Sequence, residues 1–310
     1  MVGTSIVRHI LSEYPVLKVR GTCHSSTPFF QHERLEYVEA DLTNRQDCRS
    51  AVRGCEAAVM AAAYTGGAAS AQSEPHRQTT DNLVMDANLL DACHSERVKR
   101  VAFISSATVY QDFDGLIAES QLDWGRDPHP SHLGVGWAKR SAEKLCQFWH
   151  EKYGMEIIVV RASNVIGPYA RFDPRRSNFV PALIRKAVDA MDPFEIWGNP
   201  DVKRDIIYSD DFARAVVELL FLKSVKFDTF NVGSGKLISV REAAELALAA
   251  AGHRPGEILH NNNGLGTANS RGLDCGKIRS VSGWEPQVSL EEGICRLTRW
   301  WTRNRAWWKK

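Results

Sequence analysis

The sequence lacks several features that would each indicate a particular class of protein. No apolar run approaches the roughly 20 residues of a membrane-spanning helix, and the first residues lack the apolar core of a signal peptide. The seven cysteines form no Cys-x-x-Cys pair and no zinc-ligand spacing, and their odd number favours reduced thiols over a disulfide framework. We therefore expect a cytoplasmic protein without a metal site, a membrane span or a secretory leader.

Charge of one sign is also missing. The 39 Lys and Arg residues against 37 Asp and Glu residues leave a formal charge of +2. Because no strong overall field results, nonspecific binding to nucleic acid has no global electrostatic support. Any anion-binding site must be local, and we expect no nucleic-acid partner.

The composition that is present is that of an ordinary globular protein. Apolar residues make up 44% of the 310 residues and charged residues 25%, with 22 Gly and 12 Pro, which excludes disordered, fibrous and collagen-like classes. The length is typical of one large α/β domain or two smaller ones. A sizeable buried core is therefore expected.

Short β-rich runs alternate with helical patterns along the chain. A first helix is expected from almost the first residue until near Pro15, because proline disfavours helical geometry in the residue before it. The expected strands are 16–23, 35–40, 57–63, 98–105, 155–160, 194–197 and 227–232, and the expected helices are 44–53, 79–94, 139–153, 179–191, 210–222, 240–250 and 290–301.

This alternation, with strands that are nearly continuous apolar runs, predicts an α/β fold with a doubly wound parallel sheet covered on both faces. We expect a first domain over residues 1–165, and the family resemblance carried by the motifs below implies that it is a dinucleotide-binding Rossmann domain. Residues 166–310 then form mainly a smaller C-terminal α/β substrate-binding region, with some segments returning to the first domain.

Several short motifs resemble one enzyme family. They are ISSATVY at 104–110, GWAK at 136–139, RASN at 161–164 and GP at 167–168. Together they resemble the extended short-chain dehydrogenase/reductases, which include nucleotide-sugar epimerases, dehydratases and reductases. Within that family, the segments AAAYTGG at 61–67, NFVPAL at 178–183 and 197–204 are most similar to the GDP-L-fucose synthases, and the similarity covers nearly the whole chain.

The resemblance implies a catalytic set. Ser106 would bond the reacting oxygen of the sugar, Thr108 would lie beside it, and Lys139 would bind the nicotinamide ribose. The family pattern Tyr-x-x-x-Lys, however, has Val135 in place of the tyrosine, and valine carries no ionisable proton.

Three interpretations of this substitution remain open at the level of the sequence. The protein is an enzyme with a substitute acid, an enzyme that needs no acid from this position, or a catalytically silent binder. Tyr64, at the end of an apolar strand with Thr108 and His132 behind it, is the substitute considered, against the alternative that it packs in a loop.

The start of the chain departs from the family as well. The first strand and the first glycines of the phosphate loop are absent, because the sequence starts within the loop at the Met-Val-Gly segment that ends at Gly3. We expect roughly ten to fifteen upstream residues, since two strands that flank an absent central strand would expose unpaired backbone groups at about 1–3 kcal/mol each.

The cofactor is expected to be NADP, with NAD less favoured. The segment 19–25 lacks the Asp or Glu that accepts the ribose 2′-hydroxyl of NAD, whereas Arg20, His24 and Ser25 could meet a 2′-phosphate. The helix start at Gly3 suits a pyrophosphate and Asp41 suits an adenine edge. The full cofactor set is Val2, Gly3, Arg20, His24, Ser25, Asp41, Leu42, Ala61, Ala62, Asn82 and Lys139.

The resemblance implies that the substrate is a nucleotide-diphosphate sugar of the 4-keto-6-deoxy kind and that the chain forms a homodimer. Arg204 resembles the family arginine that pairs with the diphosphate, because guanidinium is bidentate toward phosphate. Asn178 stands where fucose synthases carry a histidine acid, which argues against 3,5-epimerisation. The substrate set is Asn164, Asn178, Lys186, Trp197, Arg204 and Arg271.

Overall fold

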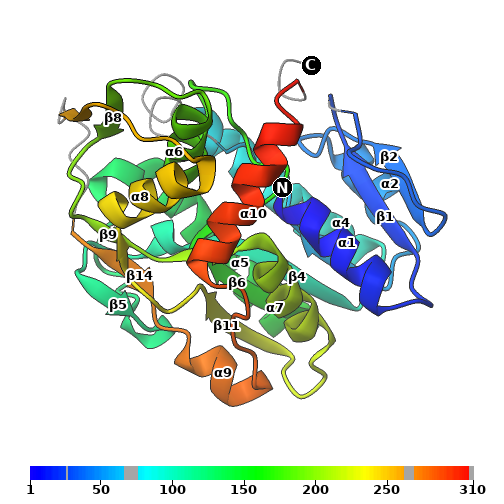
Figure 1. The fold of residues 1–310 in the computed structure, drawn as a ribbon. Helices are drawn as coiled ribbons and strands as arrows, with labels where there is room; N and C mark the ends of the chain where they lie inside the picture. The colour runs from blue at the N-terminus through cyan, green and yellow to red at the C-terminus, as the bar shows by residue number, and fades with distance from the viewer. Residues whose placement is uncertain (26, 66–75, 262–268, 307–310) are drawn as a thin grey trace.

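The computed structural model describes residues 1–25, 27–65, 76–261 and 269–306 (Figure 1). Its helices are α1 (Val2–Glu13), α2 (Arg45–Val52), α4 (Asn82–Ser95), α5 (Leu133–Tyr153), α6 (Phe179–Val188), α7 (Ser209–Phe221), α8 (Val240–Ala251), α9 (Gly276–Ser282) and α10 (Leu290–Arg303). Short helical turns are η1 (Arg77–Asp81), η2 (Ala107–Val109), η3 (Glu119–Gln121) and η4 (Pro130–His132).

The strands are β1 (Val19–Cys23), β2 (Leu35–Glu39), β3 (Ala57–Met60), β4 (Arg100–Ser106), β5 (Gly115–Ile117), β6 (Glu156–Ala162), β7 (Asn164–Ile166), β8 (Phe194–Trp197), β9 (Lys203–Arg204), β10 (Ile206–Tyr208), β11 (Phe227–Val232), β12 (Ile238–Ser239), β13 (Ile258–Asn261) and β14 (Arg271–Leu273). The expected α/β fold with parallel strands is therefore confirmed.

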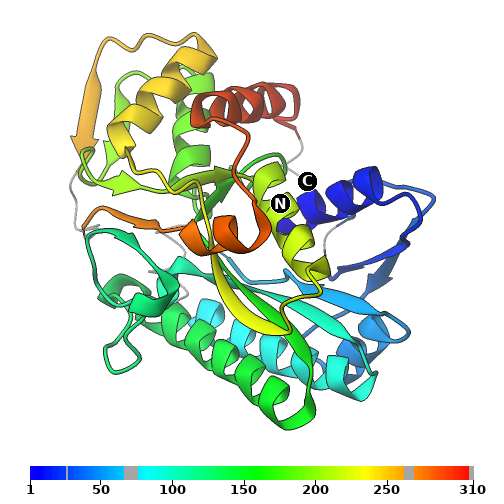
Figure 2. The same cartoon turned by 90° about the horizontal axis from the view of Figure 1, so that it is seen from below.

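The main sheet has the strand order β11-β6-β4-β3 with all strands parallel. Side chains of β6 alternate between two cores, because successive residues of a strand point to opposite faces. Ile158 and Val160 pack with α1 and α7, whereas Ile157 and Val159 pack with α4 and α5. Figure 2 shows the two helical layers on either side of the strands.

The sheet is in two parts. β1 and β2 pair with each other in parallel, from Val19 opposite Leu35 to Cys23 opposite Glu39, and no ladder joins β1 to β3 among the described strands. The two parts are linked by side chains instead. Arg34 lies immediately before β2, and its guanidinium donates to the carbonyls of Leu11 and Tyr14 at the end of α1 at 2.5 and 2.8 Å. Because α1 packs on the main sheet, this contact joins the two parts.

The C-terminal half contributes to both regions of the molecule. α6, α8 and α10 share a third core with Phe194 and Ile196 of β8, and the Trp301 ring stacks on Phe172 with centroids 4.1 Å apart. β11 and α9 instead return to the main sheet, where β11 pairs with β6. No helix in the described ranges is long and apolar enough to cross a bilayer.

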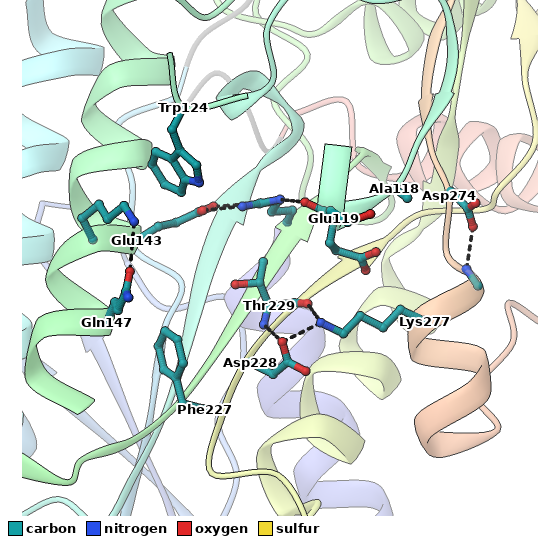
Figure 3. A pocket seen from close by; sticks show the side chains of 14 residues that line it. Ala118, Glu119, Trp124, Glu143, Gln147, Phe227, Asp228, Thr229, Asp274 and Lys277 are labelled. Atoms are coloured by element: carbon teal, nitrogen blue, oxygen red, sulfur yellow. Dashed lines mark hydrogen bonds and ion pairs between the residues drawn. The ribbon is translucent and has the colours of Figure 1, made fainter. Parts of the chain in front are cut away.

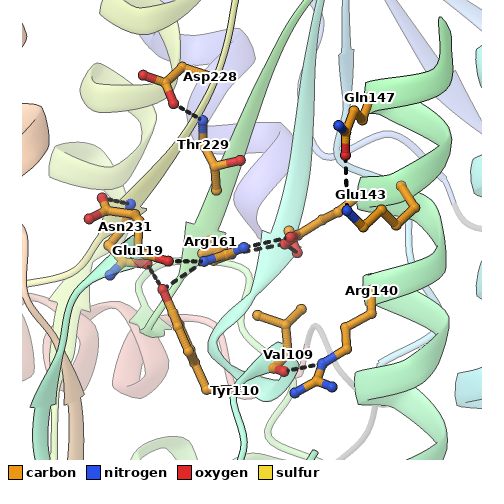
Figure 4. A network of polar contacts seen from close by, with 12 residues as sticks. Val109, Tyr110, Glu119, Arg140, Glu143, Gln147, Arg161, Asp228, Thr229 and Asn231 are labelled. Carbon is orange, nitrogen blue, oxygen red and sulfur yellow. Dashed lines mark hydrogen bonds and ion pairs between the residues drawn. The ribbon is translucent and has the colours of Figure 1, made fainter. Parts of the chain in front are cut away.

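A buried ionic network ties the main sheet to α5 (Figure 4). Arg161 on β6 donates to both carboxylate oxygens of Glu143 at 3.0 and 2.7 Å and to the Tyr110 hydroxyl at 2.9 Å. Burial raises the pKa of Tyr110 to about 12, so its neutral hydroxyl donates in turn to Asn231 at 2.7 Å. Ser105 donates to the same Glu143 carboxylate. The network fixes α5 against the ends of β4, β6 and β11.

α5 starts at Leu133, six residues earlier than the sequence suggested, and this places Val135 inside the helix with Lys139. Two glycines in its first turn allow it to lie very close to its neighbours. A Cβ on Gly136 would be 2.5 Å from Cβ of Pro128 and 2.6 Å from the carbonyl oxygen of Thr108, and one on Gly134 would overlap the Thr79 hydroxyl. The helix start is thus pressed against the segment that follows β4.

We expect Gly136→Ala to destabilise the protein, although alanine in a helix normally gains about 1 kcal/mol over glycine. The added methyl meets a backbone carbonyl that cannot move aside, and overpacking costs about 1–3 kcal/mol or more. The matched control is Gly3→Ala in α1, where the new Cβ has only Ala61 within reach, at an ordinary 3.8 Å. The urea midpoint should fall for the first variant and hold or rise for the second. Equal midpoints would show that α5 is free to shift.

Candidate active site

A cavity of about 120 Å³ lies where the carboxyl ends of β4 and β6 face the C-terminal strands β9 and β14. It brings together five of the residues that the sequence analysis singled out, from four separate parts of the chain. Its lining is Ser106, Ala107, Thr108, Phe113, His132, Ala162, Ser163, Asn164, Arg204, Asp205, Arg271, Gly272 and Leu273. We take this cavity as the candidate active site.

Two residues with hydroxyl side chains, Ser106 and Thr108, line the cavity. Ser106 is the last residue of β4, and its Oγ accepts a hydrogen bond from the Thr108 amide at 3.2 Å, which leaves its own proton to donate. The Thr108 Oγ1 atom is buried and has no hydrogen-bond partner within the described residues. Since an unsatisfied buried polar group costs about 1–3 kcal/mol, a hydrogen bond to this hydroxyl would stabilise the site.

Two residues with guanidinium groups line the cavity as well. Arg204 of β9 and Arg271 of β14 are register partners, and Arg204 donates to the carbonyls of Lys203 and Asn269 at 2.8 and 3.1 Å. Burial and the Arg271 charge lower the pKa of Arg204 to about 10, and burial lowers that of Arg271. Both remain charged at neutral pH, so this side of the cavity favours an anion.

A buried carboxylate holds the arginine-bearing strands in place. Asp205, between β9 and β10, accepts from the amide and hydroxyl of Ser234 at 2.8 and 2.6 Å and from the Leu273 amide at 3.2 Å. Its backbone carbonyl accepts from the Asn164 side chain at 2.8 Å. The side-chain NH₂ group of Asn164 thus has a structural partner, and Asn164 also lines the cavity.

His132 is the functional residue that the sequence analysis did not assign. It ends η4 immediately before α5 and lines the cavity with Ser106 and Thr108. Burial, followed by the charges of Arg271, His129 and Arg204, lowers the pKa of His132 to about 4. The signal in the sequence was its position three residues before Val135, at the amino end of the same helix.

Lys139 is buried one turn after Val135 and is already paired. Its ammonium donates to the Asp86 carboxylate at 3.0 Å and to the Ile104 carbonyl at 3.2 Å. Burial raises the pKa of Asp86, and the Lys139 charge opposes that shift. Because an ammonium has three donors, one of them remains for a ribose hydroxyl.

The start of α1 and the end of β3 meet closely. A Cβ at Gly3 would lie 3.8 Å from Cβ of Ala61, so a side chain there would narrow the approach to the first helical amides. Asn82 bonds the backbone of Tyr64 on both sides, accepting from its amide at 2.7 Å and donating to its carbonyl at 3.0 Å. This clamp holds the segment after β3, which includes Ala62, in an extended path. Gly66 and Gly67 of the same motif lie outside the described residues.

The adenine side of the predicted cofactor site has a local hydrogen-bond network. The Asp41 carboxylate accepts from the hydroxyl and amide of Thr43, bonds that lower its pKa, and the His24 charge lowers it further. His24 and Ser25 are exposed at the end of β1. Val2 and Leu42 contribute their side chains to the two cores.

Arg20 was wrongly predicted as a phosphate ligand. Its guanidinium donates to the carbonyls of Ala51 and Arg53 at 3.4 and 2.7 Å and pairs with Glu36. Residues 51–53 precede β3, so Arg20 points to the amino end of the parallel strands, away from Gly3 and Ala61. Spacing along a strand did not reveal this direction.

Lys186, predicted to bind substrate, lies beside Trp197 and outside the lining of this cavity. Its buried ammonium donates to the Glu195 carbonyl at 2.7 Å and lies 4.9 Å from the centre of the Trp197 ring, which is 51% exposed. Asn178 precedes α6 as its N-cap. These three residues belong to the α6–β8 region and not to the lining of the cavity.

Tyr64 has partners of its own. The Arg176 guanidinium donates to its hydroxyl at 2.6 Å, and the Arg77 guanidinium lies 4.2 Å from the centre of its ring. It thus lies between two arginines beside the cofactor segment. Its role as a substitute acid stays a prediction.

A larger cavity of about 600 Å³ lies between α5, β11 and α9 (Figure 3). Four of its seven charged side chains form two ion pairs, Arg161 with Glu143 and Lys277 with Asp228 at 2.5 Å. This larger cavity therefore has no concentration of one charge like that of Arg204 and Arg271 in the candidate active site. Within the described residues, no three His, Cys, Asp or Glu side chains gather as a metal site would require.

Comparisons with known proteins agree with this architecture. GDP-L-fucose synthase from Sinorhizobium fredii (strain NBRC 101917 / NGR234) is 31% identical over 301 residues, covering 96% of this chain and 90% of that protein. UDP-glucose 4-epimerase from Thermotoga maritima, solved with UDP-glucose, has a TM-score of 0.84 at 22% identity and covers 98% of this chain and 96% of its own. A GDP-D-glycero-L-gluco-heptose synthase from Campylobacter jejuni, solved in the presence of NADPH, has a TM-score of 0.80 at 22% identity. The match covers 97% of this chain and 95% of that protein.

A family model provides the remaining comparison. The model of the NAD dependent epimerase/dehydratase family matches residues 1–233, which is well over half of the chain. The protein therefore belongs to the NAD dependent epimerase/dehydratase family.

Proposed function

We propose that this protein is an NADP(H)-dependent epimerase or reductase of a nucleotide-diphosphate sugar, with a 4-keto-6-deoxy sugar as its substrate class. The observation that carries the proposal is the cavity that opposes Arg204 and Arg271 to the hydroxyls of Ser106 and Thr108. The two guanidinium groups would bind a diphosphate, and the two hydroxyl groups would bind a sugar carbonyl or hydroxyl oxygen. Relatives named as GDP-L-fucose synthase and GDP-mannose 3,5-epimerase support the same class.

The arginine pair suits a diphosphate better than a single phosphate group. Two adjacent guanidiniums, each partly desolvated, repel one another in the free protein, and burial lowers the pKa of both. A diphosphate diester carries two negative charges, and each guanidinium can bond it in the bidentate manner. Binding therefore relieves the repulsion as it forms charge-assisted hydrogen bonds.

We expect Arg271→Gln to weaken binding of GDP-mannose by about 10- to 150-fold, since a hydrogen bond to a charged group contributes about 1.5–3 kcal/mol. Lys203→Gln is the matched control, because it removes the same charge from an exposed neighbour on β9. Isothermal titration calorimetry of both variants with GDP-mannose and UDP-glucose measures the difference. Equal losses in the two variants would reject a specific diphosphate site.

The cofactor residues that fit a dinucleotide are the first amides of α1, Ala61, the Asp41 side chain and the third donor of Lys139. The bound nicotinamide would supply or accept hydride at the sugar carbon. We propose NADP(H) because His24 and Ser25 are exposed at the end of β1, where a 2′-phosphate would meet a ring nitrogen and a hydroxyl rather than a carboxylate.

The substitution His24→Glu should invert the cofactor preference. A carboxylate repels the 2′-phosphate and accepts a ribose 2′-hydroxyl, so affinity for NADPH should fall at least tenfold while affinity for NADH rises. Arg20→Gln is the control, and its NADPH affinity should stay within about twofold, because the Arg20 guanidinium is bonded at the far end of the strands. Fluorescence titration with NADPH and NADH measures both variants. A wild-type preference for NADH would contradict the assignment.

A silent binding protein is the second candidate, favoured by Val135 and Asn178 at positions where the family resemblance implies proton donors. Both candidates bind NADPH and the nucleotide sugar. They differ in turnover, which oxidation of NADPH at 340 nm with 4-keto-6-deoxy sugar nucleotides would detect.

We also propose a cytoplasmic homodimer. All seven cysteines are free, as in a reducing compartment. α5 exposes Leu133, Trp137 and Phe148 along one helical face, with exposed fractions of 46, 40 and 43%, and Val84 of α4 is 38% exposed. Such an apolar stripe is typical of a covered surface. Sedimentation equilibrium should give twice the chain mass, and Phe148→Glu should give the monomer; a wild-type monomer would reject the dimer.

A further inference from the structure

We infer that His132 is the proton-transfer residue of this cavity and takes the part that the missing phenol at position 135 would otherwise have. This inference rests on the proposed function, because it assigns a step to the same cavity. It resolves the conflict between a complete substrate cavity and the absence of an ionisable group at Val135.

The position of His132 is the first support. It lines the cavity together with Ser106 and Thr108, and it precedes Val135 by three residues at the start of α5. Both residues belong to the amino end of α5, His132 as its N-cap and Val135 within its first turn, so the imidazole lies within one turn of position 135. The close contact of Gly136 with Thr108 keeps this helix start against the two hydroxyls.

The chemistry of the other lining residues is the second support. Arg204 and Arg271 do not release protons at neutral pH. The Asp205 carboxylate is buried and holds three hydrogen bonds from Ser234 and Leu273. Burial raises the pKa of Asp205, but its hydrogen bonds occupy both carboxylate oxygens. Among the described lining residues, His132 is therefore the titratable side chain left to exchange a proton with a bound sugar.

The charges around His132 couple its protonation to substrate binding. Arg271 of β14, Arg204 of β9 and His129, whose ring is centred 6.1 Å away, all disfavour the imidazolium, while Asp112 pairs with His129 at 3.9 Å and Asp205 lies across the cavity. In the free protein, burial first and these charges second keep the imidazole neutral. A bound diphosphate neutralises the two arginines and so raises the pKa of His132 toward the working pH.

The proton step follows directly. In the reductive direction a bound reduced nicotinamide would supply hydride to the carbonyl carbon, so that the π-electron pair moves to the carbonyl oxygen. The imidazolium of His132 gives its proton to that oxygen and then recovers one from water. In the oxidative direction neutral His132 takes the hydroxyl proton. Ser106 and Thr108 hold the oxygen throughout.

Nuclear magnetic resonance of the histidine-labelled protein tests the coupling without turnover. The His132→Gln spectrum assigns the His132 imidazole signal, which is then followed against pH. We expect half-protonation far below 6.5 in the free protein and an upward shift of at least one pH unit with saturating GDP-mannose. Arg271→Gln should shift the free protein in the same direction. A His132 signal that titrates identically with and without GDP-mannose would overturn the coupling.

Kinetics test the proton transfer itself. His132→Gln should lower kcat by about 10²- to 10⁴-fold, with KM changed less than threefold, and should remove one limb of the pH profile. His260→Gln, which changes an exposed histidine of β13 outside the cavity lining, should retain kcat within about twofold. Val135→Tyr should restore the His132→Gln variant at least tenfold, because it returns an ionisable group to the same space. A merely structural role of His132 would not produce this rescue.

The outcomes separate this inference from the proposed function. Failure of both NADPH and GDP-mannose to bind overturns the two together. Binding with unchanged turnover and pH profile in His132→Gln overturns the His132 assignment alone. Binding of both ligands with no turnover in the wild type on any 4-keto-6-deoxy sugar nucleotide also overturns it, in favour of a silent binder.

Discussion

The candidate site depends on one buried carboxylate. Asp205 is fully buried, yet it accepts three hydrogen bonds from Ser234 and Leu273, and its own backbone bonds Asn164 and Arg271. Removing an ionised group from water is costly unless such bonds replace its hydration, so the surrounding segments are constrained to one arrangement. A Cβ on Gly233 would overlap the carboxylate, which shows how closely the chain surrounds it. Through this carboxylate, β7, β9 and β14 present their polar side chains to one cavity.

A second constraint acts from the Rossmann side. Arg161 and Glu143 pair within the sheet–helix interface, and glycines at 134 and 136 let α5 approach the turn after β4. The start of α5 therefore positions three residues that bear on the chemistry of the site. They are His132, Val135 and Lys139. The packing of α5 sets the position of these residues. Valine at position 135 does not displace the helix, but it removes an ionisable side chain from the site. Loss of an ionisable group and loss of the site are different events in this structure.

Much of the fold could be predicted from the sequence because the buried strands are continuous apolar runs and the helices carry caps and breakers. The strands at Phe194–Trp197 and Phe227–Val232 and the end of α1 before Pro15 agree with the prediction. Side-chain direction could not be predicted in the same way. Arg20 and Lys186 are basic residues near predicted sites, but each donates to backbone carbonyls that only the folded chain brings within reach. His132 was passed over for the opposite reason, because its neighbours in space, Arg204 and Arg271, are far away in sequence.

The electrostatic arrangement explains why a histidine could serve where the family resemblance implies a tyrosine. A phenol has an ordinary pKa near 10 and needs a nearby cation such as Lys139 to lower it, whereas an imidazole begins near 6.5. In this chain the ammonium of Lys139 is bound to Asp86, so its field is largely compensated where a phenol would need it. Burial, followed by the charges of Arg271, His129 and Arg204, instead lowers the pKa of His132 to about 4. A substrate that carries negative charge to the two arginines would cancel their part of that shift when a proton is required, so the same charges that bind the diphosphate would time the proton transfer.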